Sequence, residues 1–406
     1  MALSPRIARL LARLERPERL ILGLMSGTSL DGLDLALCRF SGHGEATAVE
    51  LLHCTTVPYA APEQARLRAV VFQQQALLEE VALLNRWLAE HHAAAVTRAL
   101  ADWGVAAEAV ACLASHGQTV YHAPGSRRGG GPPSNATLQL GDGDLLAVRT
   151  GIPTVSDFRQ KEIAGGGQGA PLAPYAEALL FGNAARARVM VNLGGIANFS
   201  WLPAAGEGHP VVFGDTGPAN TLLDLAVRRW FPAAAEGFDR DGRLSAGGRA
   251  NGELLRIFLD HPFFALPCPK STGPETFGAE FLDRALATAA HQGVPTPAPA
   301  DLLATLAALT AQSLAATLAR EVPDWQKAEC YLSGGGRHNA TLMASLADAL
   351  PGVSPRDSSA LGIPPDAKEA VLFATLANET LWGSGFSVGW QPGAAKIGFG
   401  KLSFPD

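Results

Sequence analysis

The chain has little charge, little cysteine and few aromatic residues for its length. Of 406 residues, 17% are charged and 7% are aromatic, and the net charge is −6. A mildly acidic chain lacks the clustered Lys and Arg that bind phosphate backbones, so nucleic acid is excluded as its main partner. Because 47% of the residues are hydrophobic, intrinsic disorder is also excluded, and the length predicts about two or three domains.

Signals for disulfides, zinc, secretion and membrane insertion are missing. The five cysteines form no Cys-x-x-Cys pair, no His/Cys cluster has zinc spacing, and a reducing, cytoplasmic location is expected. Residues 1–20 lack the apolar core of a signal peptide and predict an amphipathic helical extension or a frayed tail. The uncharged stretch Leu302–Ala319 carries five polar residues, which favours a buried helix over a membrane span.

Three well-known catalytic or nucleotide-binding patterns are also missing. There is no P-loop, no Gly-x-Gly-x-x-Gly after an opening strand and no Gly-x-Ser-x-Gly elbow. The neighbours Ser115 and His116 do not make a hydrolase, because a nucleophilic serine needs its base across space. His116 is interpreted as a neutral hydrogen-bonding group at a strand end, and His91 and His92 as surface residues.

Two stretches of the chain share one order of elements. Strands are predicted at Ile21–Met25, Leu33–Phe40 and Val49–Val57, with helical spacing over Pro62–Leu100 and a strand at Ala109–Ala114. A second series has strands at Arg188–Leu193, Phe199–Leu202, Val211–Phe213 and Cys330–Leu332, with helices to about Trp230 and over Arg337–Leu350. This echo predicts two related α/β halves with a ligand in the cleft they form. The expected division is 1–20 as an extension, 21–185 as domain I, onto which 382–406 packs back, and 186–381 as domain II.

Three glycine turns follow these strands and are candidate phosphate cradles, because glycine lets backbone N–H groups approach phosphate oxygens. They contain Gly27, Thr28, Ser29, Leu30, Asp31, Gly32, Leu33 and Asp34; Gly194 and Gly195; and Gly334, Gly335 and Gly336. One such turn alone is more often a plain hairpin. Three at strand ends favour a nucleotide clamp.

Two carboxylates beside these turns are candidates for chemistry. Asp31 is a candidate Mg²⁺ ligand, since one or two carboxylates near phosphates suffice; the alternative is that it only satisfies its own turn. Asp215 follows the Val211–Phe213 strand, and the positive end of the next helix is expected to keep it ionised and able to accept a proton. The alternative for Asp215 is a helix N-cap.

Ten short motifs, in order, resemble the anhydro-N-acetylmuramic acid kinase family. The first is Leu22-Gly-Leu-Met-Ser-Gly-Thr-Ser-Leu-Asp-Gly-Leu-Asp34. The others are Ser115-His-Gly-Gln-Thr119, Asp157-Phe-Arg159, Gly165–Leu172, Asn192–Gly195, Asp215–Asn220, Phe238-Asp-Arg-Asp-Gly242, Lys270-Ser-Thr-Gly273, Gly334–Gly336 and Gly362–Pro365 with Glu369. Departures are Ala219, Pro274, the N-terminal extension and an Arg127–Pro133 insert.

The resemblance implies an actin-like ATPase fold, with two RNase H-like domains around an interdomain cleft. It implies ATP and Mg²⁺ as cofactors, a homodimer, and phosphorylation of 1,6-anhydro-N-acetylmuramic acid coupled to hydrolytic ring opening in peptidoglycan recycling. Carried over by motif, Asp215 is the general base and Glu369 a second catalytic group, while His116, Gln118, Arg159 and Asn220 contact the sugar. Two alternatives stay open: an actin-like ATPase acting as chaperone or regulator, and a kinase for another small sugar.

Overall fold

The computed structural model describes residues 4–27, 29–126, 134–182, 184–234, 236–388 and 396–406. Thr28 and the insert at 127–133 therefore lie outside the described residues. The contacts divide the chain into a first unit, Met1–Leu180 with Gly362–Asp406, and a second unit, Phe181–Leu361. The stretch 362–381, which the sequence analysis assigned to domain II, belongs instead to the first unit, because the helix it forms packs on that unit's strands.

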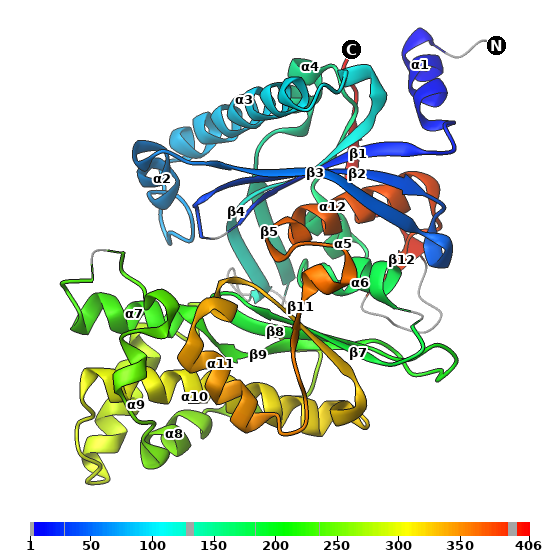
Figure 1. Cartoon of the computed structure of the whole chain (residues 1–406). Coiled ribbons are helices and arrows are strands. Elements are labelled where there is room, and N and C mark those ends of the chain that lie inside the picture. Colours follow the sequence, from blue (N-terminus) through cyan, green and yellow to red (C-terminus); the bar gives the residue numbers. More distant parts are fainter. Residues whose placement is uncertain (1–3, 28, 127–133, 183, 235, 389–395) are drawn as a thin grey trace. The chain divides into compact units, whose positions relative to one another are not determined.

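The first unit contains an α/β core preceded by a short helix (Figure 1). Its helices are α1 (Pro5–Leu14), α2 (Ala61–Arg68), α3 (Leu78–Asp102), α4 (Gly143–Thr150), α5 (Phe158–Ala164), α6 (Ala173–Phe181) and α12 (Pro365–Trp382). Its strands are β1 (Arg19–Ser26), β2 (Gly32–Ser41), β3 (Ala48–Pro58), β4 (Val110–Ser126), β5 (Ser134–Leu140), β6 (Thr154–Ser156), β12 (Phe386–Ser387), β13 (Lys396–Ile397) and β14 (Lys401–Ser403).

The main sheet of this unit has the order β14-β6-β4-β1-β2-β3, with β5 paired to β4. β1, β2 and β3 form an antiparallel meander, while β4 runs parallel to β1 and β6 parallel to β4. β1 and β4 therefore end at the same edge of the sheet, where Ser26 lies opposite Gln118. This register brings the first glycine turn beside the segment that follows Ser115.

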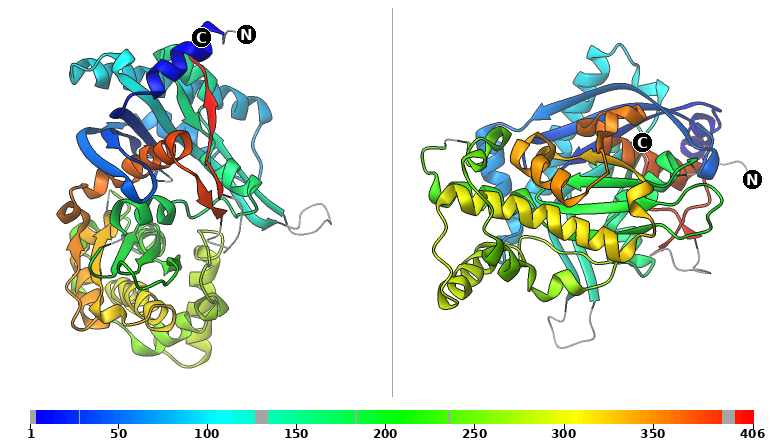
Figure 2. Two further views of the ribbon diagram at one scale, coloured as in Figure 1. Left: turned by 90° about the vertical axis from the view of Figure 1, so that its right-hand side faces the viewer. Right: turned by 60° about the horizontal axis from the view of Figure 1, so that its bottom comes forward.

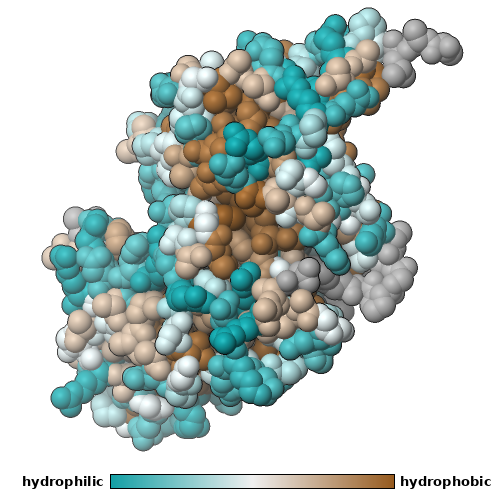
Figure 3. Space-filling view, turned by 45° about the vertical axis from the view of Figure 1, so that its right-hand side comes forward, coloured by the Kyte–Doolittle hydropathy of each residue, from teal (hydrophilic) through white to brown (hydrophobic). Residues whose placement is uncertain are grey.

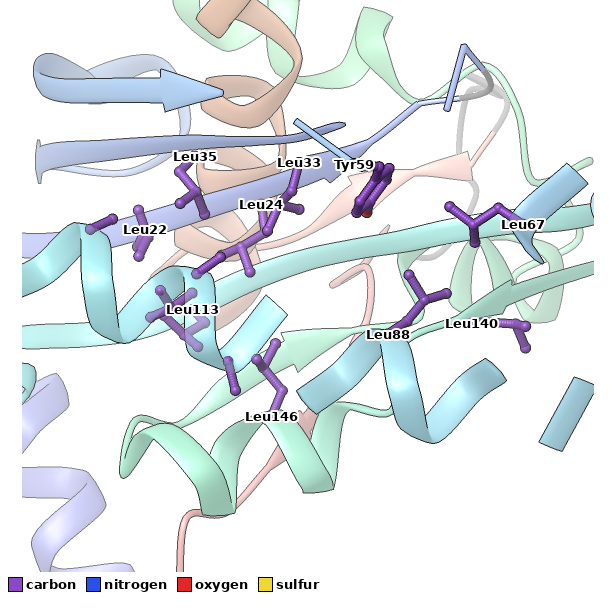
Figure 4. Close-up of a cluster of buried hydrophobic side chains, with 14 of the residues drawn as sticks. Leu22, Leu24, Leu33, Leu35, Tyr59, Leu67, Leu88, Leu113, Leu140 and Leu146 are labelled. Atoms are coloured by element: carbon purple, nitrogen blue, oxygen red, sulfur yellow. The ribbon is translucent and has the colours of Figure 1, made fainter. Parts of the chain in front are cut away.

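Leucine side chains from strands and helices that lie far apart in the sequence fill the core of the first unit (Figure 4). Leu22 and Leu24 of β1 point toward the same cluster as Leu113 of β4 and Leu88 of α3. The other side of the sheet is covered by α12, whose backbone lies directly against β1. A Cβ atom on Gly23 would stand 1.9 Å from the carbonyl oxygen of Ala370, so only glycine permits this approach.

The second unit is one continuous segment with its own sheet. Its helices are α7 (Asn220–Trp230), α8 (Gly252–Leu259), α9 (Ala279–His291), α10 (Pro299–Glu321) and α11 (Ala340–Ala349). Its strands are β7 (Arg188–Leu193), β8 (Ile196–Leu202), β9 (Val212–Pro218), β10 (Glu329–Ser333) and β11 (Arg356–Asp357).

The second sheet repeats the strand order of the first. Its order is β11-β10-β7-β8-β9, with an antiparallel β7-β8-β9 meander and β10 and β11 joined in parallel. Read from β9, the strands follow the chain order third-second-first-fourth-fifth. The strands β3-β2-β1-β4-β6 of the first sheet follow the same order when β5, which pairs only with β4, is left out. The prediction of two related, RNase H-like α/β halves is confirmed by this shared topology.

The long helix α10 supports the second sheet and is the buried helix that the sequence predicted. Figure 2 shows it (yellow) running across the green strands in the right-hand view. By length and composition alone it is the one helix in the described part of the chain that could cross a membrane, and 72% of its most apolar window is buried inside the protein. This burial supports the prediction of a core helix.

The N-terminal extension forms the helix α1, which sits on the surface of the first unit. Leu14 accepts a hydrogen bond from Trp382 through its carbonyl oxygen, and Arg13 donates to the carbonyl of Gly151. Figure 3 shows hydrophilic and hydrophobic residues side by side over this helix, at the top right beside the grey N-terminal atoms. The predicted amphipathic helix is therefore confirmed over Pro5–Leu14.

Candidate functional site

The first glycine turn joins β1 to β2 and bends sharply. Leu30 adopts a left-handed backbone (φ +58°) and its N–H donates to the carbonyl of Gly27 over 3.3 Å. The side chains of Leu30 and Leu33 are buried in the core. Leu30 and Leu33 could therefore contact a phosphate only through their backbone groups. That this turn cradles phosphates stays a prediction.

The two carboxylates of this turn have different surroundings. Asp31 is exposed and accepts a 2.6 Å hydrogen bond from the Ser29 hydroxyl, which is the turn-satisfying contact of the alternative reading. Asp34 accepts from Thr56 over 2.5 Å, and burial raises its pKa to about 6, with Asp31 and Glu369 adding to the rise. Asp31 is therefore the more accessible ligand for a cation.

A buried chain of hydrogen bonds fixes the point where this turn leaves β1. The Ser26 hydroxyl donates to Gln118 Oε1 over 2.6 Å and so accepts from the Tyr59 hydroxyl over 2.9 Å. Tyr59 in turn accepts from His92 Nε2 over 2.8 Å. His92 was predicted at the surface and is instead buried, because α3 packs this face against the core. Gln118 is fully buried, and its side-chain NH₂ donates to the Thr119 carbonyl.

His116, Arg159 and Glu369 form a second group in the first unit. His116 Nδ1–H donates to the Gly117 carbonyl over 2.7 Å, and its Nε2 accepts from Arg159 Nε over 2.9 Å. Burial and the Arg159 charge hold the pKa of His116 at about 3, so the ring is neutral, as predicted. Glu369 reaches solvent, yet the atoms packed around it raise its pKa while Arg159 lowers it.

Asp215 lies inside strand β9 rather than after it. The strand runs to Pro218 and helix α7 begins only at Asn220, so the predicted stabilisation by a helix N-terminus is wrong. Burial raises the pKa of Asp215 to about 6, and the donors that lower it are the Thr272 N–H (2.7 Å) and the Ser271 hydroxyl (3.1 Å). Asp215 is thus a buried carboxylate poised to exchange a proton near neutral pH.

The other two glycine turns meet at one edge of the second sheet, because β7 and β10 are parallel neighbours. Gly334 has a φ of +82°, and a Cβ there would stand 2.6 Å from Asn192 Oδ1. Asn220 donates to the carbonyls of Leu193 (3.1 Å) and Gly194 (2.8 Å), which fixes the β7–β8 hairpin. The remaining turn, at 27–32, belongs to the first unit.

A pocket of about 490 Å³ opens beside Gly335, and the sequence analysis assigned no role to most of its walls. It is lined by Asn220, Leu223, Asp224, Phe238, Asp239, Arg240, Asp241, Gly335, His338 and Asn339. Asp239 shapes it by accepting from the Leu244 N–H (2.7 Å) and the Ser245 hydroxyl (2.5 Å). The sequence shows the motif Phe238–Gly242, but only the fold brings this motif close to Asn339.

The pocket and the 334–336 turn beside it form a candidate ligand site in the second unit. The volume falls within the ordinary range of ligand pockets, about 300–1,000 Å³, and backbone approaches that a Cβ would block lie next to it. Among the described residues there is no cluster of three His, Cys, Asp or Glu that could hold a metal ion.

Comparisons with known proteins agree with the motifs. The family model of anhydro-N-acetylmuramic acid kinase matches residues 19–396. The anhydro-N-acetylmuramic acid kinase of Pseudoalteromonas atlantica is 43% identical over 406 residues, covering 100% of both chains. The enzyme of the same name from Caldanaerobacter subterraneus is 37% identical over 397 residues, covering 97% of this chain and 99% of its own. A ROK family glucokinase from Streptomyces griseus, solved with glucose and AMPPNP, gives a TM-score of 0.36 at 13% identity, covering 88% of this chain and 97% of its own.

Proposed function

Because the chain belongs to the anhydro-N-acetylmuramic acid kinase family, we propose that it phosphorylates 1,6-anhydro-N-acetylmuramic acid with ATP and opens the anhydro ring with water. The products are N-acetylmuramic acid 6-phosphate and ADP, in the recycling of peptidoglycan. The observation that carries this function is the family match over residues 19–396, together with full-length relatives of one activity.

Asp215 is the proposed general base. A water oxygen attacks C1 of the sugar while Asp215 takes the water proton. The C1–O6 bond breaks, O6 bonds to the γ-phosphorus, and the bond from that phosphorus to ADP breaks. A pKa of about 6 suits this role, since at neutral pH the carboxylate is ionised yet more basic than an ordinary aspartate.

The residues of the first unit are proposed to bind the sugar and the transferred phosphate. Both ring nitrogens of His116 are occupied within the protein, so His116 orients Arg159 rather than donating to a ligand. The Arg159 guanidinium has the charge and the planar fork to pair with the lactyl carboxylate of the sugar. Glu369, whose pKa is raised, is the proposed second acid–base group.

Nucleotide binding is proposed at the 194–195 and 334–336 turns and the pocket beside them, with the backbone N–H groups of residues 27–34 toward the phosphates. Thr28 belongs to that proposal and lies outside the described residues. Asp31 is the proposed Mg²⁺ ligand; when bound, the cation would offset the negative charge of the phosphates. Asn220 acts by holding the 194–195 hairpin.

The Asp215→Asn variant tests the mechanism. An amide cannot take up the water proton, so kcat is expected to fall by about 10²–10⁴-fold, the usual contribution of general base catalysis. ADP release should depend on the anhydro sugar, and reaction in ¹⁸O-water should place the label at C1. The matched control is Asp348→Asn, an exposed aspartate on α11, which should keep the wild-type rate.

Three results would overturn the proposal. An Asp215→Asn enzyme with wild-type kcat would remove the base. ATP hydrolysis that ignores the anhydro sugar would favour an actin-like ATPase, and turnover of another sugar alone would favour the third alternative. A cytoplasmic homodimer is proposed on family resemblance, and sedimentation analysis of the purified protein tests the dimer.

A further inference from the structure

Three consecutive residues, Lys270, Ser271 and Thr272, make four contacts that fix one carboxylate and the segment itself. The Lys270 carbonyl accepts the Asp215 N–H over 2.9 Å. The Ser271 hydroxyl and the Thr272 N–H both donate to Oδ2 of Asp215, over 3.1 and 2.7 Å. Lys270 is buried, and its ammonium donates to the Phe263 carbonyl over 3.1 Å, which anchors the segment.

The Ser271 hydroxyl and the Thr272 N–H donate to the same oxygen of the Asp215 carboxylate. Among the described residues no hydrogen bond is made to Oδ1, so Oδ1 is the oxygen with a free lone pair to accept a proton. A carboxylate held at one oxygen by two donors cannot rotate without losing both bonds. The geometry therefore separates the two oxygens into a held one and a reactive one.

We propose that Ser271 is a positioning residue for the reaction: together with the Thr272 N–H it holds Oδ2, presents Oδ1 to the attacking water and keeps the base ionised. This inference rests on the proposed function, in which Asp215 is the base. It also gives a physical reason for the motif Lys270-Ser-Thr-Gly273, to which sequence reasoning attached no role.

The charged groups around Asp215 are few, so the loss of one donor is expected to be measurable. Burial raises the pKa of Asp215 and Glu275 raises it further, while Lys270 lowers it. Cys268, whose own pKa burial raises to about 11, is neutral at working pH. From helix α10, which packs on β9, Arg320 and Glu321 act on Lys270 with opposite signs.

The Ser271→Ala variant removes one donor and keeps the backbone N–H. A hydrogen bond to a charged group stabilises the charged form, and the bond from the part-buried Ser271 hydroxyl, at 3.1 Å, is long for this class. The acid limb of the kcat/KM–pH profile should then move up by about one unit. Well below both limbs, the variant should be at least about tenfold slower than wild type. Toward alkaline pH the difference should shrink to the part that is caused by the lost positioning of Oδ1.

Ser271→Thr is the matched control, because it keeps the hydroxyl and should keep the wild-type limb. A constant fraction of unfolded protein lowers kcat/KM equally at every pH and does not move the acid limb of the profile. A partly unfolded variant therefore still gives the pKa of the base. If Ser271→Ala yields no folded protein, Ser271→Cys replaces it; its weaker donor should move the limb in the same direction by a smaller amount.

The outcomes are distinguishable. An Asp215→Asn variant that stays active overturns the proposed function itself. If Asp215→Asn is inactive but Ser271→Ala and Ser271→Thr share the wild-type limb, the base assignment stands and the role of Ser271 is refuted. If the acid limb of Ser271→Ala moves up and that of Ser271→Thr does not, the proposal holds.

Discussion

Asp215 is the residue at which burial and chemistry oppose each other. The residue is only 8% exposed, and the surrounding protein raises the pKa of its carboxyl from the ordinary 3.8 to about 6. The native state therefore binds this proton more tightly than the unfolded chain does. Stability from this residue is fully present below about pH 3.8 and is lost as the pH rises through about 6.

The Asp215→Asn variant, whose kcat is expected to be strongly reduced, should therefore be no less stable than wild type at neutral pH. A shift of about two units corresponds to about 3 kcal/mol, which is the upper limit of the expected gain in unfolding free energy at pH 7.5. Toward pH 4 the difference should shrink, because the wild-type carboxyl is then protonated. Urea unfolding at both pH values measures it.

A clear loss of stability in that variant at pH 7.5 would contradict this reading of Asp215, since it would mean that the charged carboxylate stabilises the fold. Asp348→Asn serves again as control and should leave the unfolding free energy unchanged at both pH values. The pairing of lost activity with retained stability is typical of residues kept for chemistry.

At the scale of elements, the sequence predicted the bounds of strands that consist of apolar residues throughout. It did not predict the ends of strands that continue beyond their apolar residues. β7 has the predicted bounds, Arg188–Leu193. β4 and β9 run past their apolar stretches, to Ser126 and Pro218, because neighbouring strands supply hydrogen-bond partners for polar and glycine residues. The predicted helical region 62–100 contains two helices, α2 and α3, which residues 69–77 separate.

The contact of β1 with α12 gives a prediction at this scale. A methyl group at Gly23 would meet the Ala370 carbonyl oxygen at 1.9 Å, and backbone atoms cannot rotate away. Gly23→Ala must push α12 off the sheet and should lower the unfolding free energy by about 1–3 kcal/mol or more. Thermal and urea unfolding measure the loss.

Gly252→Ala is the control for that substitution. Gly252 opens α8, and a Cβ there would meet nothing within 4 Å. Alanine favours a helix over glycine, so this variant should be as stable as wild type or slightly more stable. If Gly23→Ala matched it, the close approach of α12 to β1 would not exist in solution.

The whole molecule consists of two units of one topology, but only the second is continuous in sequence. Its core draws on residues 187–353 alone, and every residue of the 490 Å³ pocket comes from it. The first unit needs Gly362–Asp406 to return to its sheet, since α12 packs on β1 and β2 and β14 pairs with β6. The two units therefore differ in what they need to fold.

A fragment of residues 181–361 is expected to fold by itself and to bind ATP, although it should not phosphorylate the sugar. A single cooperative thermal transition by circular dichroism and saturable ATP binding by calorimetry would agree with this. The matched fragment 1–180 lacks α12 and β14 and should stay unfolded or aggregate. An unfolded 181–361 fragment would show that the second core depends on the first.

The sequence by itself determined the α/β class, the repeat, the family and the residue types of the chemistry, because apolar spacing and short motifs are local and survive without coordinates. Only the tertiary structure decided which residues meet. Ser271 and Thr272 reach Asp215 across more than fifty positions, α12 joins a sheet formed by the other end of the chain, and His92 is buried by packing that its own helix does not reveal. Such contacts depend on strand register and on how helices cover a sheet, and the residues next to each position in the sequence determine neither.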